Sequence, residues 1–235
     1  MSRSMRMILP RPVAAVVFDM DGLLFDTEKL YGHAILTAAR ELGVEMSAEV
    51  FHTFIGTPWS HNRRQMLEAY GEAYPAEELR VAWMRHFKLL VADSLELKPG
   101  VEALLDLLDE MGLPRAIATS SSHGTVEQHL GAHGLTDRFH HVVASGDYDN
   151  SKPAPDPFLR AAERLKVDPR DCLALEDSLN GVRSAASAGM MTVMVPDLLQ
   201  PTEEIRSLCA GVVASLLDVP ALISPSRRGS AAASS

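Results

Sequence analysis

The chain has few cysteines, no long apolar run and no excess of positive charge. Its 235 residues include two cysteines, Cys172 and Cys209, which are too few for a disulfide framework and fit a reduced, cytoplasmic setting. No stretch reaches the roughly 18 uninterrupted apolar residues that a membrane-spanning helix needs. The formal net charge of −9 argues against nonspecific binding to nucleic acid or to anionic membranes. We therefore expect neither of these two partners.

The two ends of the chain lack the pattern of a packed core. Residues 1–11 are expected to form a loose lead-in, and residues 223–235 a flexible tail rich in Ser and Ala. Two arginines precede an apolar region in the lead-in, as in a signal peptide, but Arg11 and Pro12 interrupt that region. Cleavage there would also remove the acidic segment described next, so we expect no signal peptide.

The most informative segment is an apolar run that ends in two acids. Residues 13–18 are typical of a buried parallel strand, and Asp19, Asp21 and Gly22 follow at once. The carboxyl ends of such strands form the ligand-binding edge of an open α/β sheet. Two carboxylates at that edge repel each other and lose hydration, so they need a cation or a proton. Their hard oxygen atoms suit Mg²⁺, which the sequence therefore predicts as the cofactor.

Three further segments carry polar groups that suit a phosphate site. Two of them are short apolar runs that end in hydroxyl or acidic residues, and the third is a proline-flanked turn with one lysine. The residues are Thr119 and Ser120, Glu176 and Asp177, and Lys152. Together with the first acid pair, they supply hydroxyl donors, a cation and a second acid pair. Three of the four segments directly follow a predicted strand, so a parallel sheet would bring them to one edge.

The periodicity of the chain predicts an α/β fold with a helical insertion. Helical stretches are expected at 30–42, 47–54, 59–70 and 76–92, with no convincing strand among them. Later in the chain, short apolar strands alternate with helices, at 116–118, 141–144, 173–175, 191–195 and 211–213. Such alternation indicates parallel strands joined by right-handed crossovers. We predict a Rossmann-like, doubly wound parallel sheet formed by residues 12–28 and 94–222, with a small α-helical cap domain at 29–93.

The four polar segments, in this order, resemble the haloacid dehalogenase superfamily of phosphohydrolases. The resemblance extends from about residue 13 to about residue 195 and rests on Asp19 through Glu28, Thr119, Lys152 through Asp156, and Glu176 through Gly181. The closest subgroup includes β-phosphoglucomutase and phosphatases of sugar phosphates and phosphoglycolate. The resemblance implies Mg²⁺-dependent hydrolysis of a small phosphomonoester through an aspartyl-phosphate intermediate. It also implies a helical cap after the first motif.

The resemblance implies a role for each residue of the predicted core site. Asp19 would be the nucleophile and Asp21 the general acid/base, and the second acid favours phosphate chemistry over carbon–halogen cleavage. The phosphoryl group would be bound by Thr119, Ser120 and Lys152. Mg²⁺ would be held by Asp19, the backbone carbonyl of Asp21, Glu176 and Asp177.

The residue types alone leave other roles open: Asp19 could be a metal ligand without a covalent role, Asp21 a turn residue, and Lys152 a solvated surface lysine. Thr119 is also a good helix N-cap, in which case its hydroxyl would serve the backbone rather than a phosphate. Glu176 and Asp177 also suit the N-terminus of a following helix, where negative charge is favourable, and this role is compatible with metal binding.

Residues of the predicted cap are candidates for substrate contact, and they bear on the type of reaction. The candidates are Glu28, Tyr31, Trp59 and Arg63. Resemblance to β-phosphoglucomutase would require a histidine where Tyr31 lies and an arginine where Trp59 lies. We therefore favour a phosphatase and keep a sugar phosphomutase as the alternative, with a non-enzymatic metal-binding or receiver-like module as a third reading. A monomer or weak dimer is expected.

Overall fold

The computed structural model describes residues 8–54, 57 and 59–223. Most of the two predicted flexible tails lies outside these residues. The inner ends of both tails belong to the folded part: Leu9 and Ile223 are buried in the main hydrophobic cluster. Arg11 donates to the carboxylate of Asp171 at 3.0 Å. No described helix is both long enough and apolar enough to cross a membrane.

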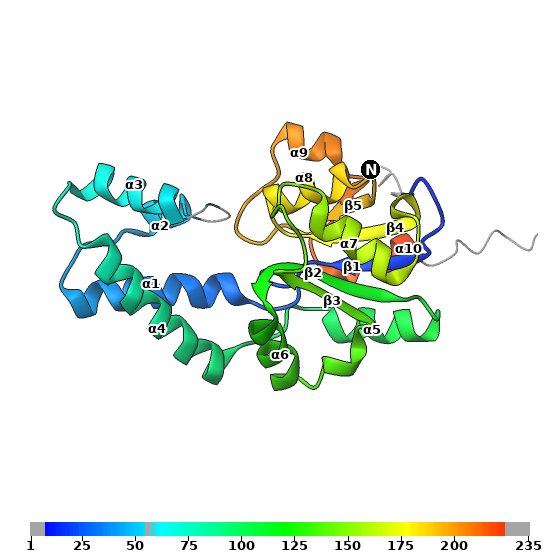
Figure 1. The fold of residues 1–235 in the computed structure, drawn as a ribbon, viewed down its shortest axis with the longest axis horizontal. Helices are drawn as coiled ribbons and strands as arrows, with labels where there is room; N and C mark the ends of the chain where they lie inside the picture. The colour runs from blue at the N-terminus through cyan, green and yellow to red at the C-terminus, as the bar shows by residue number, and fades with distance from the viewer. Residues whose placement is uncertain (1–7, 55–56, 58, 224–235) are drawn as a thin grey trace, which may run out of the picture.

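A parallel sheet forms the centre of the larger lobe of the molecule (Figure 1). Its strands are β1 (Ala15–Phe18), β2 (Arg115–Ser122), β3 (His141–Ser145), β4 (Cys172–Glu176), β5 (Met191–Met194) and β6 (Gly211–Val212). They lie in the order β3-β2-β1-β4-β5-β6, and every neighbouring pair is parallel. This is the strand order of a doubly wound fold, so the predicted Rossmann-like class is confirmed.

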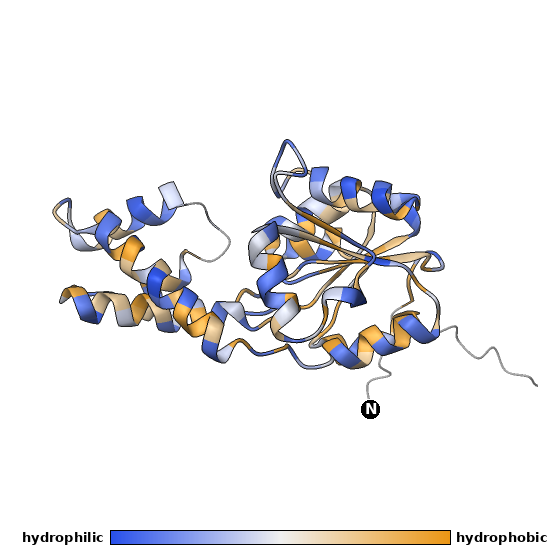
Figure 2. Ribbon diagram, turned by 60° about the horizontal axis from the view of Figure 1, so that its bottom comes forward, coloured by the Kyte–Doolittle hydropathy of each residue, from blue (hydrophilic) through white to orange (hydrophobic). Residues whose placement is uncertain are grey.

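Helices cover both faces of the sheet, because alternate side chains of each strand point to opposite faces. On one face, Val16 and Phe18 of β1 join a hydrophobic cluster with α5 (Val101–Glu110) and α6 (His123–Ala132). On the other face, Ala15 and Val17 pack with α7 (Asp156–Leu165) and α8 (Leu179–Ser187). Figure 2 shows the strands as mostly hydrophobic, between helices in which hydrophilic and hydrophobic residues alternate. Burial on both faces explains the continuous apolar run of β1.

The remaining elements are short and lie in the connections between the other elements or after β6. They are the helices α9 (Glu203–Leu208) and α10 (Pro220–Ile223) and the 3₁₀ turns Thr136–Arg138, Pro169–Asp171 and Leu216–Asp218.

Four helices between β1 and α5 form a separate lobe (Figure 1). They are α1 (Thr27–Leu42), α2 (Ala48–His52), α3 (Trp59–Tyr70) and α4 (Ala76–Ser94). Each coincides closely with a helical stretch expected from the sequence. The lobe has its own hydrophobic cluster, centred on residues such as Ile35, Met66 and Trp83. We call these four helices the helical lobe.

Two linkers join the helical lobe to the sheet, and they pair with each other. The Asp26 amide donates to the Glu96 carbonyl, and the Lys98 amide donates to the Leu24 carbonyl, each at 2.9 Å. α1 begins at Thr27 and α4 ends at Ser94, so the helical lobe extends slightly beyond the cap expected at residues 29–93 at both ends. The division into a core domain and a cap domain stays a prediction.

Candidate active site

The candidate site lies where the chain reverses its direction of winding across the sheet. β1 and β4 are neighbours, but their connections lead to opposite edges, which opens a crevice at their carboxyl ends. Asp19 directly follows β1, Glu176 is the last residue of β4, and Asp177 follows it. The Asp19 amide donates to the Leu175 carbonyl at 3.0 Å, so the β1–β4 pairing continues to the first acid.

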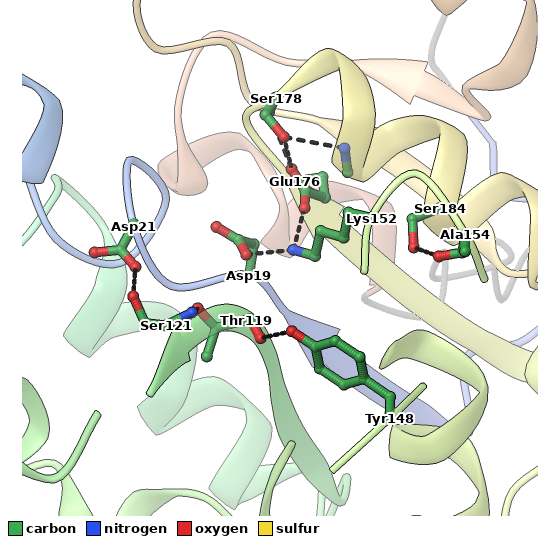
Figure 3. A network of polar contacts seen from close by, with 11 residues as sticks. Asp19, Asp21, Thr119, Ser121, Tyr148, Lys152, Ala154, Glu176, Ser178 and Ser184 are labelled. Carbon is green, nitrogen blue, oxygen red and sulfur yellow. Dashed lines mark hydrogen bonds and ion pairs between the residues drawn. The ribbon is translucent and has the colours of Figure 1, made fainter. Parts of the chain in front are cut away.

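Lys152 connects the two acid pairs (Figure 3). Its ammonium group donates to Asp19 and, at 2.6 Å, to Oε1 of Glu176. The side chain is only 7% exposed, although the residue lies in the loop between β3 and α7. Burial alone would lower the pKa of Lys152, but Asp19 and Glu176 outweigh it and raise that pKa. Lys152 is therefore a fixed cation within the site.

Both carboxylate oxygens of Glu176 are occupied. Oε1 accepts from Lys152, and Oε2 accepts from the amide and the hydroxyl of Ser178, each at 3.0 Å. Gly181 in the first turn of α8 lies so close that a Cβ there would overlap the carboxylate. Glu176 is thus held in place and orients Lys152.

The acids of the site fit a hard divalent cation. Asp19, Glu176 and Asp177 each offer an oxygen, and these atoms lie within 4.8 Å of one another. Oδ1 of Asp177 is buried and has no hydrogen-bond partner among the residues that the structure describes. Gly22 has φ of 83°, and its lack of a side chain leaves space beside the Asp177 carboxylate. Because the oxygens of Glu176 are already engaged, Asp19 and Asp177 have the more available ligand atoms.

The electrostatics of the site also call for more positive charge than Lys152 supplies. Burial raises the pKa of Asp19 to about 8, against the opposing effect of Lys152 and with a further contribution from Glu176. Burial, followed by repulsion from Glu176 and Asp19, raises the pKa of Asp177 well above its ordinary range. One lysine faces three buried acids, so a divalent cation would balance the remaining charge.

The end of β2 brings hydroxyl groups to the same place. Thr119 is buried, and its hydroxyl accepts from the Ser121 amide at 3.0 Å. The N-cap of α6 is Ser122, whose hydroxyl accepts from the Thr125 amide. The capping role that the sequence left open for Thr119 therefore belongs to Ser122. The N-cap of α8 is Ser178, whose hydroxyl accepts from the Gly181 amide, and the first turn of this helix holds no acid.

Two polar contacts of this region were not predicted from the sequence. The hydroxyl of Ser121 donates to Oδ2 of Asp21 at 2.8 Å, and the hydroxyl of Tyr148 donates to the Thr119 carbonyl at 3.0 Å (Figure 3). Ser121 lies in a run of four hydroxyl residues, 119–122. The sequence predicted a role for this segment but did not indicate Ser121 within it. No sequence signal marked Tyr148.

All four predicted segments meet at one cavity of about 150 Å³. The predicted residues that line it are Asp19, Asp21, Glu28, Thr119, Ser120, Lys152 and Asp177. Ser178 lines it as well, together with Leu198 and Leu199 from the loop after β5. The two leucines were not among the sequence candidates, because apolar residues of a loop carry no chemical signature.

A second cavity of about 510 Å³ continues from the first toward the helical lobe. Glu28 and Ser120 line both cavities, and Tyr31 and Trp59 line the second. Burial, with smaller contributions from Asp197 and Asp21, raises the pKa of Glu28 to about 7. Arg63, the fourth lobe candidate, lines neither cavity.

Arg63 has a different environment from the one that we expected. It forms an exposed ion pair with Glu77 at 3.4 Å. Among the described residues, the cation that lines the second cavity is instead Arg80 of α4, which we did not select from the sequence. Both arginines lie on helices with mixed polar and apolar residues, and the sequence pattern did not show which would face the cavity.

Comparison with known proteins shows the family to which the chain belongs. Residues 16–195 match the family described as haloacid dehalogenase-like hydrolase. The chain belongs to this family. The resemblance inferred from its motifs is therefore confirmed, and so is the expected class of enzyme, a phosphoric monoester hydrolase.

Individual relatives support the same assignment. The chain is 40% identical to the probable pseudouridine-5'-phosphatase of Drosophila melanogaster, with 88% of this chain and 92% of that protein covered. It is 32% identical to hexitol phosphatase B of Escherichia coli K12, with 81% and 86% covered. Among solved structures, it is similar to a putative β-phosphoglucomutase from Thermotoga maritima, with a TM-score of 0.75, 27% identity, and 88% of this chain and 96% of that chain covered.

Proposed function

We propose that this hydrolase is a Mg²⁺-dependent phosphatase that cleaves a small phosphomonoester through an aspartyl-phosphate at Asp19. The observation that carries the proposal is the contact of Lys152 with both Asp19 and Glu176, beside a small cavity lined by Asp177 and Thr119. This arrangement offers a nucleophile, a fixed cation and hydroxyl groups to one phosphoryl group. The phosphatase names of the relatives support it.

The residues of the site divide the reaction into two displacements. In the first, a carboxylate oxygen of Asp19 attacks phosphorus, the bond from phosphorus to the ester oxygen breaks, and Asp21 gives its proton to the leaving alkoxide. In the second, Asp21 takes a proton from a water molecule, whose oxygen attacks the aspartyl-phosphate. The bond from phosphorus to Asp19 then breaks, and inorganic phosphate and the free carboxylate result.

The charged groups around Asp19 have distinct tasks in this scheme. Lys152 would reduce the repulsion between the Asp19 carboxylate and the phosphoryl oxygens, and Thr119 and Ser120 would donate to those oxygens. A bound Mg²⁺, held by Asp19, the Asp21 carbonyl and Asp177 with Glu176 nearby, would supply further positive charge for the phosphoryl group. The contact from Ser121 would orient Asp21.

The first prediction concerns Asp19. We expect Asp19→Asn to lower kcat by about a thousandfold or more, because an amide is a poor nucleophile. The variant should remain folded, since the substitution removes a carboxyl whose pKa burial raises to about 8. Phosphate release measures the first effect, and circular dichroism measures the second. A folded Asp19→Asn protein with nearly full activity would exclude the covalent mechanism.

The metal requirement can be tested in the same assay. EDTA should abolish phosphate release by the unaltered protein, and Mg²⁺ should restore it. Mg²⁺ should also raise the melting temperature of the unaltered protein, since a ligand that binds only the folded state stabilises it. The rise should be smaller for Asp177→Asn. Full activity of a metal-free protein would contradict this part of the proposal.

A sugar phosphomutase remains the alternative, because the similar structures include a putative β-phosphoglucomutase. ³¹P NMR separates the two reactions: a phosphatase accumulates inorganic phosphate, whereas a mutase converts one sugar phosphate into an isomer. We expect inorganic phosphate, since Tyr31 and Trp59 stand where the mutase resemblance requires histidine and arginine. A cytoplasmic location and a monomer or weak dimer stay predictions.

A further inference from the structure

The cavity next to the helical lobe has aromatic walls. It shares Glu28 and Ser120 with the smaller cavity, so a phosphomonoester bound at Asp19 would place its alcohol part in this space. The aromatic residues that line it are Tyr31, Phe51, Phe54, Trp59 and Trp83. Phe51, Phe54 and Trp83 belong to the buried cluster of the lobe, whereas Tyr31 and Trp59 are half-buried. Tyr31 and Trp59 are therefore the aromatic residues with ring surface accessible to the leaving group, because Phe51, Phe54 and Trp83 are at most 5% exposed.

Arg80 adds a cation to these walls. Its guanidinium carbon lies 4.9 Å from the centroid of the Trp59 ring. The ring itself is held in position, because its indole N–H donates to Glu77 at 3.2 Å. Glu77 also pairs with Arg63, and within the described part of the chain no ion pair or hydrogen bond joins Arg80 to another side chain. The guanidinium of Arg80 thus has a fixed support and available donors.

We propose that Arg80 is a specificity-determining residue and that the leaving group of the substrate carries a flat ring with carbonyl oxygens. This inference rests on the proposed phosphatase function. Aromatic rings and a guanidinium group offer flat surfaces on which another ring stacks. The planar N–H fork of Arg80 can donate to carbonyl oxygens at the edge of that ring. The substrate class is thus a phosphomonoester of the nucleoside 5'-phosphate kind.

Two other classes fit the cavity less well. A linear polyol phosphate has hydroxyl groups but no flat surface, so it would leave the ring walls without a partner. A substrate with a second phosphate would gain from Arg80, but it would also face the carboxyl group of Glu28 in the same cavity. The relatives are named for substrates of more than one class, so the lining of this cavity carries the choice.

The test compares substrates and variants in one assay of phosphate release. The ring-bearing substrates are pseudouridine 5'-phosphate and uridine 5'-monophosphate, the polyol is sorbitol 6-phosphate, and fructose 1,6-bisphosphate carries a second anion. The unaltered protein is compared with Arg80→Gln and Arg80→Lys. Arg85→Gln is the matched control, because Arg85 lies on the same helix but pairs with Glu41.

The expected result is selective. We expect Arg80→Gln to lower kcat/KM for the ring-bearing substrates by about 10- to 50-fold, mainly through KM, since a guanidinium donor to a substrate oxygen is lost. The polyol phosphate should change by less than about twofold, because it makes no such contact. Arg80→Lys should retain part of the preference, and Arg85→Gln all of it.

Several results would overturn the inference. One is an equal loss for all substrates in Arg80→Gln, and another is a preference of the unaltered protein for the polyol or the bisphosphate. If the unaltered protein releases phosphate from none of them, the proposed function fails. Binding then still decides the inference: in an Asp19→Asn background, uridine 5'-monophosphate should bind at least about tenfold more weakly when Arg80 is replaced by Gln.

Discussion

At the scale of single residues, the position of Glu176 depends on the absence of a side chain at position 181. The Glu176 carboxylate fills the space that a Cβ of residue 181 would need. It is also the acceptor that holds Lys152 against Asp19. A glycine with no direct contact to a substrate is therefore part of the structure that positions the lysine.

We expect Gly181→Ala to displace Glu176 and with it Lys152. The predicted results are a loss of about tenfold or more in kcat/KM and a decrease of about 1–3 kcal/mol in the free energy of unfolding, since the added methyl group overfills a packed site. Phosphate release and urea denaturation measure the two effects.

Gly131→Ala in α6 is the matched control. A Cβ at Gly131 would meet no atom of the described part of the chain within 4 Å, and its backbone is not in the left-handed region. This change should leave activity unaltered and stabilise the helix by up to about 1 kcal/mol. If both alanine variants behave alike, the close approach of Gly181 to Glu176 has no functional importance.

At the scale of elements, the loop between β3 and α7 carries Lys152 and is held at several points. Asp147 accepts from the Ala144 amide at 3.0 Å and pairs with Arg164 at 3.1 Å. Tyr148 donates to the end of β2, and the Ala154 carbonyl accepts from Ser184 of α8 at 2.5 Å (Figure 3). The loop is thus joined to β2, β3 and the helices α7 and α8, so the lysine has a rigid base.

The acid Asp147 should make the stability of this loop depend on pH. Burial alone would raise its pKa, but the Ala144 amide, Arg164 and His123 outweigh burial and lower the pKa from 3.8 to about 2. In the unfolded chain the carboxyl takes up its proton near pH 4, and in the folded chain only near pH 2. The stabilisation is therefore complete above about pH 5 and is lost as the pH falls from there to about 2.

We expect Asp147→Asn to lower the free energy of unfolding by about 1–2 kcal/mol at pH 7. The difference from the unaltered protein should shrink as the pH falls toward 2. Urea denaturation at a series of pH values measures it, and Asp149→Asn, which changes an exposed acid of the same loop, should show no such trend. A difference that stays constant from pH 7 to pH 3 would rule out this explanation.

At the scale of the whole molecule, Lys98 joins the linkers of the helical lobe to the sheet. Its ammonium group lies 2.7 Å from Asp197 in the loop after β5 and 3.7 Å from Asp26 in the other linker. The same loop supplies Leu198 and Leu199 to the small cavity. One ion-pair cluster therefore connects the lobe, the linkers and a wall of the candidate site.

We expect Lys98→Met to lower the free energy of unfolding by about 1–3 kcal/mol, because it leaves the poorly exposed carboxylate of Asp197 without a cation. The double variant Lys98→Met/Asp197→Asn should recover part of the loss, since both charges are then removed. A double-mutant cycle by urea denaturation measures the coupling. Strictly additive effects would show that this ion pair does not contribute.

The sequence alone determined the sheet and the central part of the candidate site. Apolar runs buried on both faces marked the strands, and the acids Asp19, Glu176 and Asp177 followed two of those runs. Because parallel strands bring their carboxyl ends to one edge, local patterns were sufficient to bring distant segments together. The same reasoning placed Thr119 near the acids, whereas the expectation for Lys152, which lies in a turn, depended mainly on the family resemblance.

Only the tertiary structure decided the parts of the site that depend on how helices pack. The sequence selected Arg63 for the cavity of the lobe, but the packing of α3 and α4 turns Arg80 toward it and pairs Arg63 with Glu77. The sequence also did not show that Ser122 rather than Thr119 caps α6, or that Leu198 lines the small cavity. The physical reason is that strand ends are fixed by a repeating backbone geometry, whereas the face that a mixed helix presents depends on its contacts with other elements.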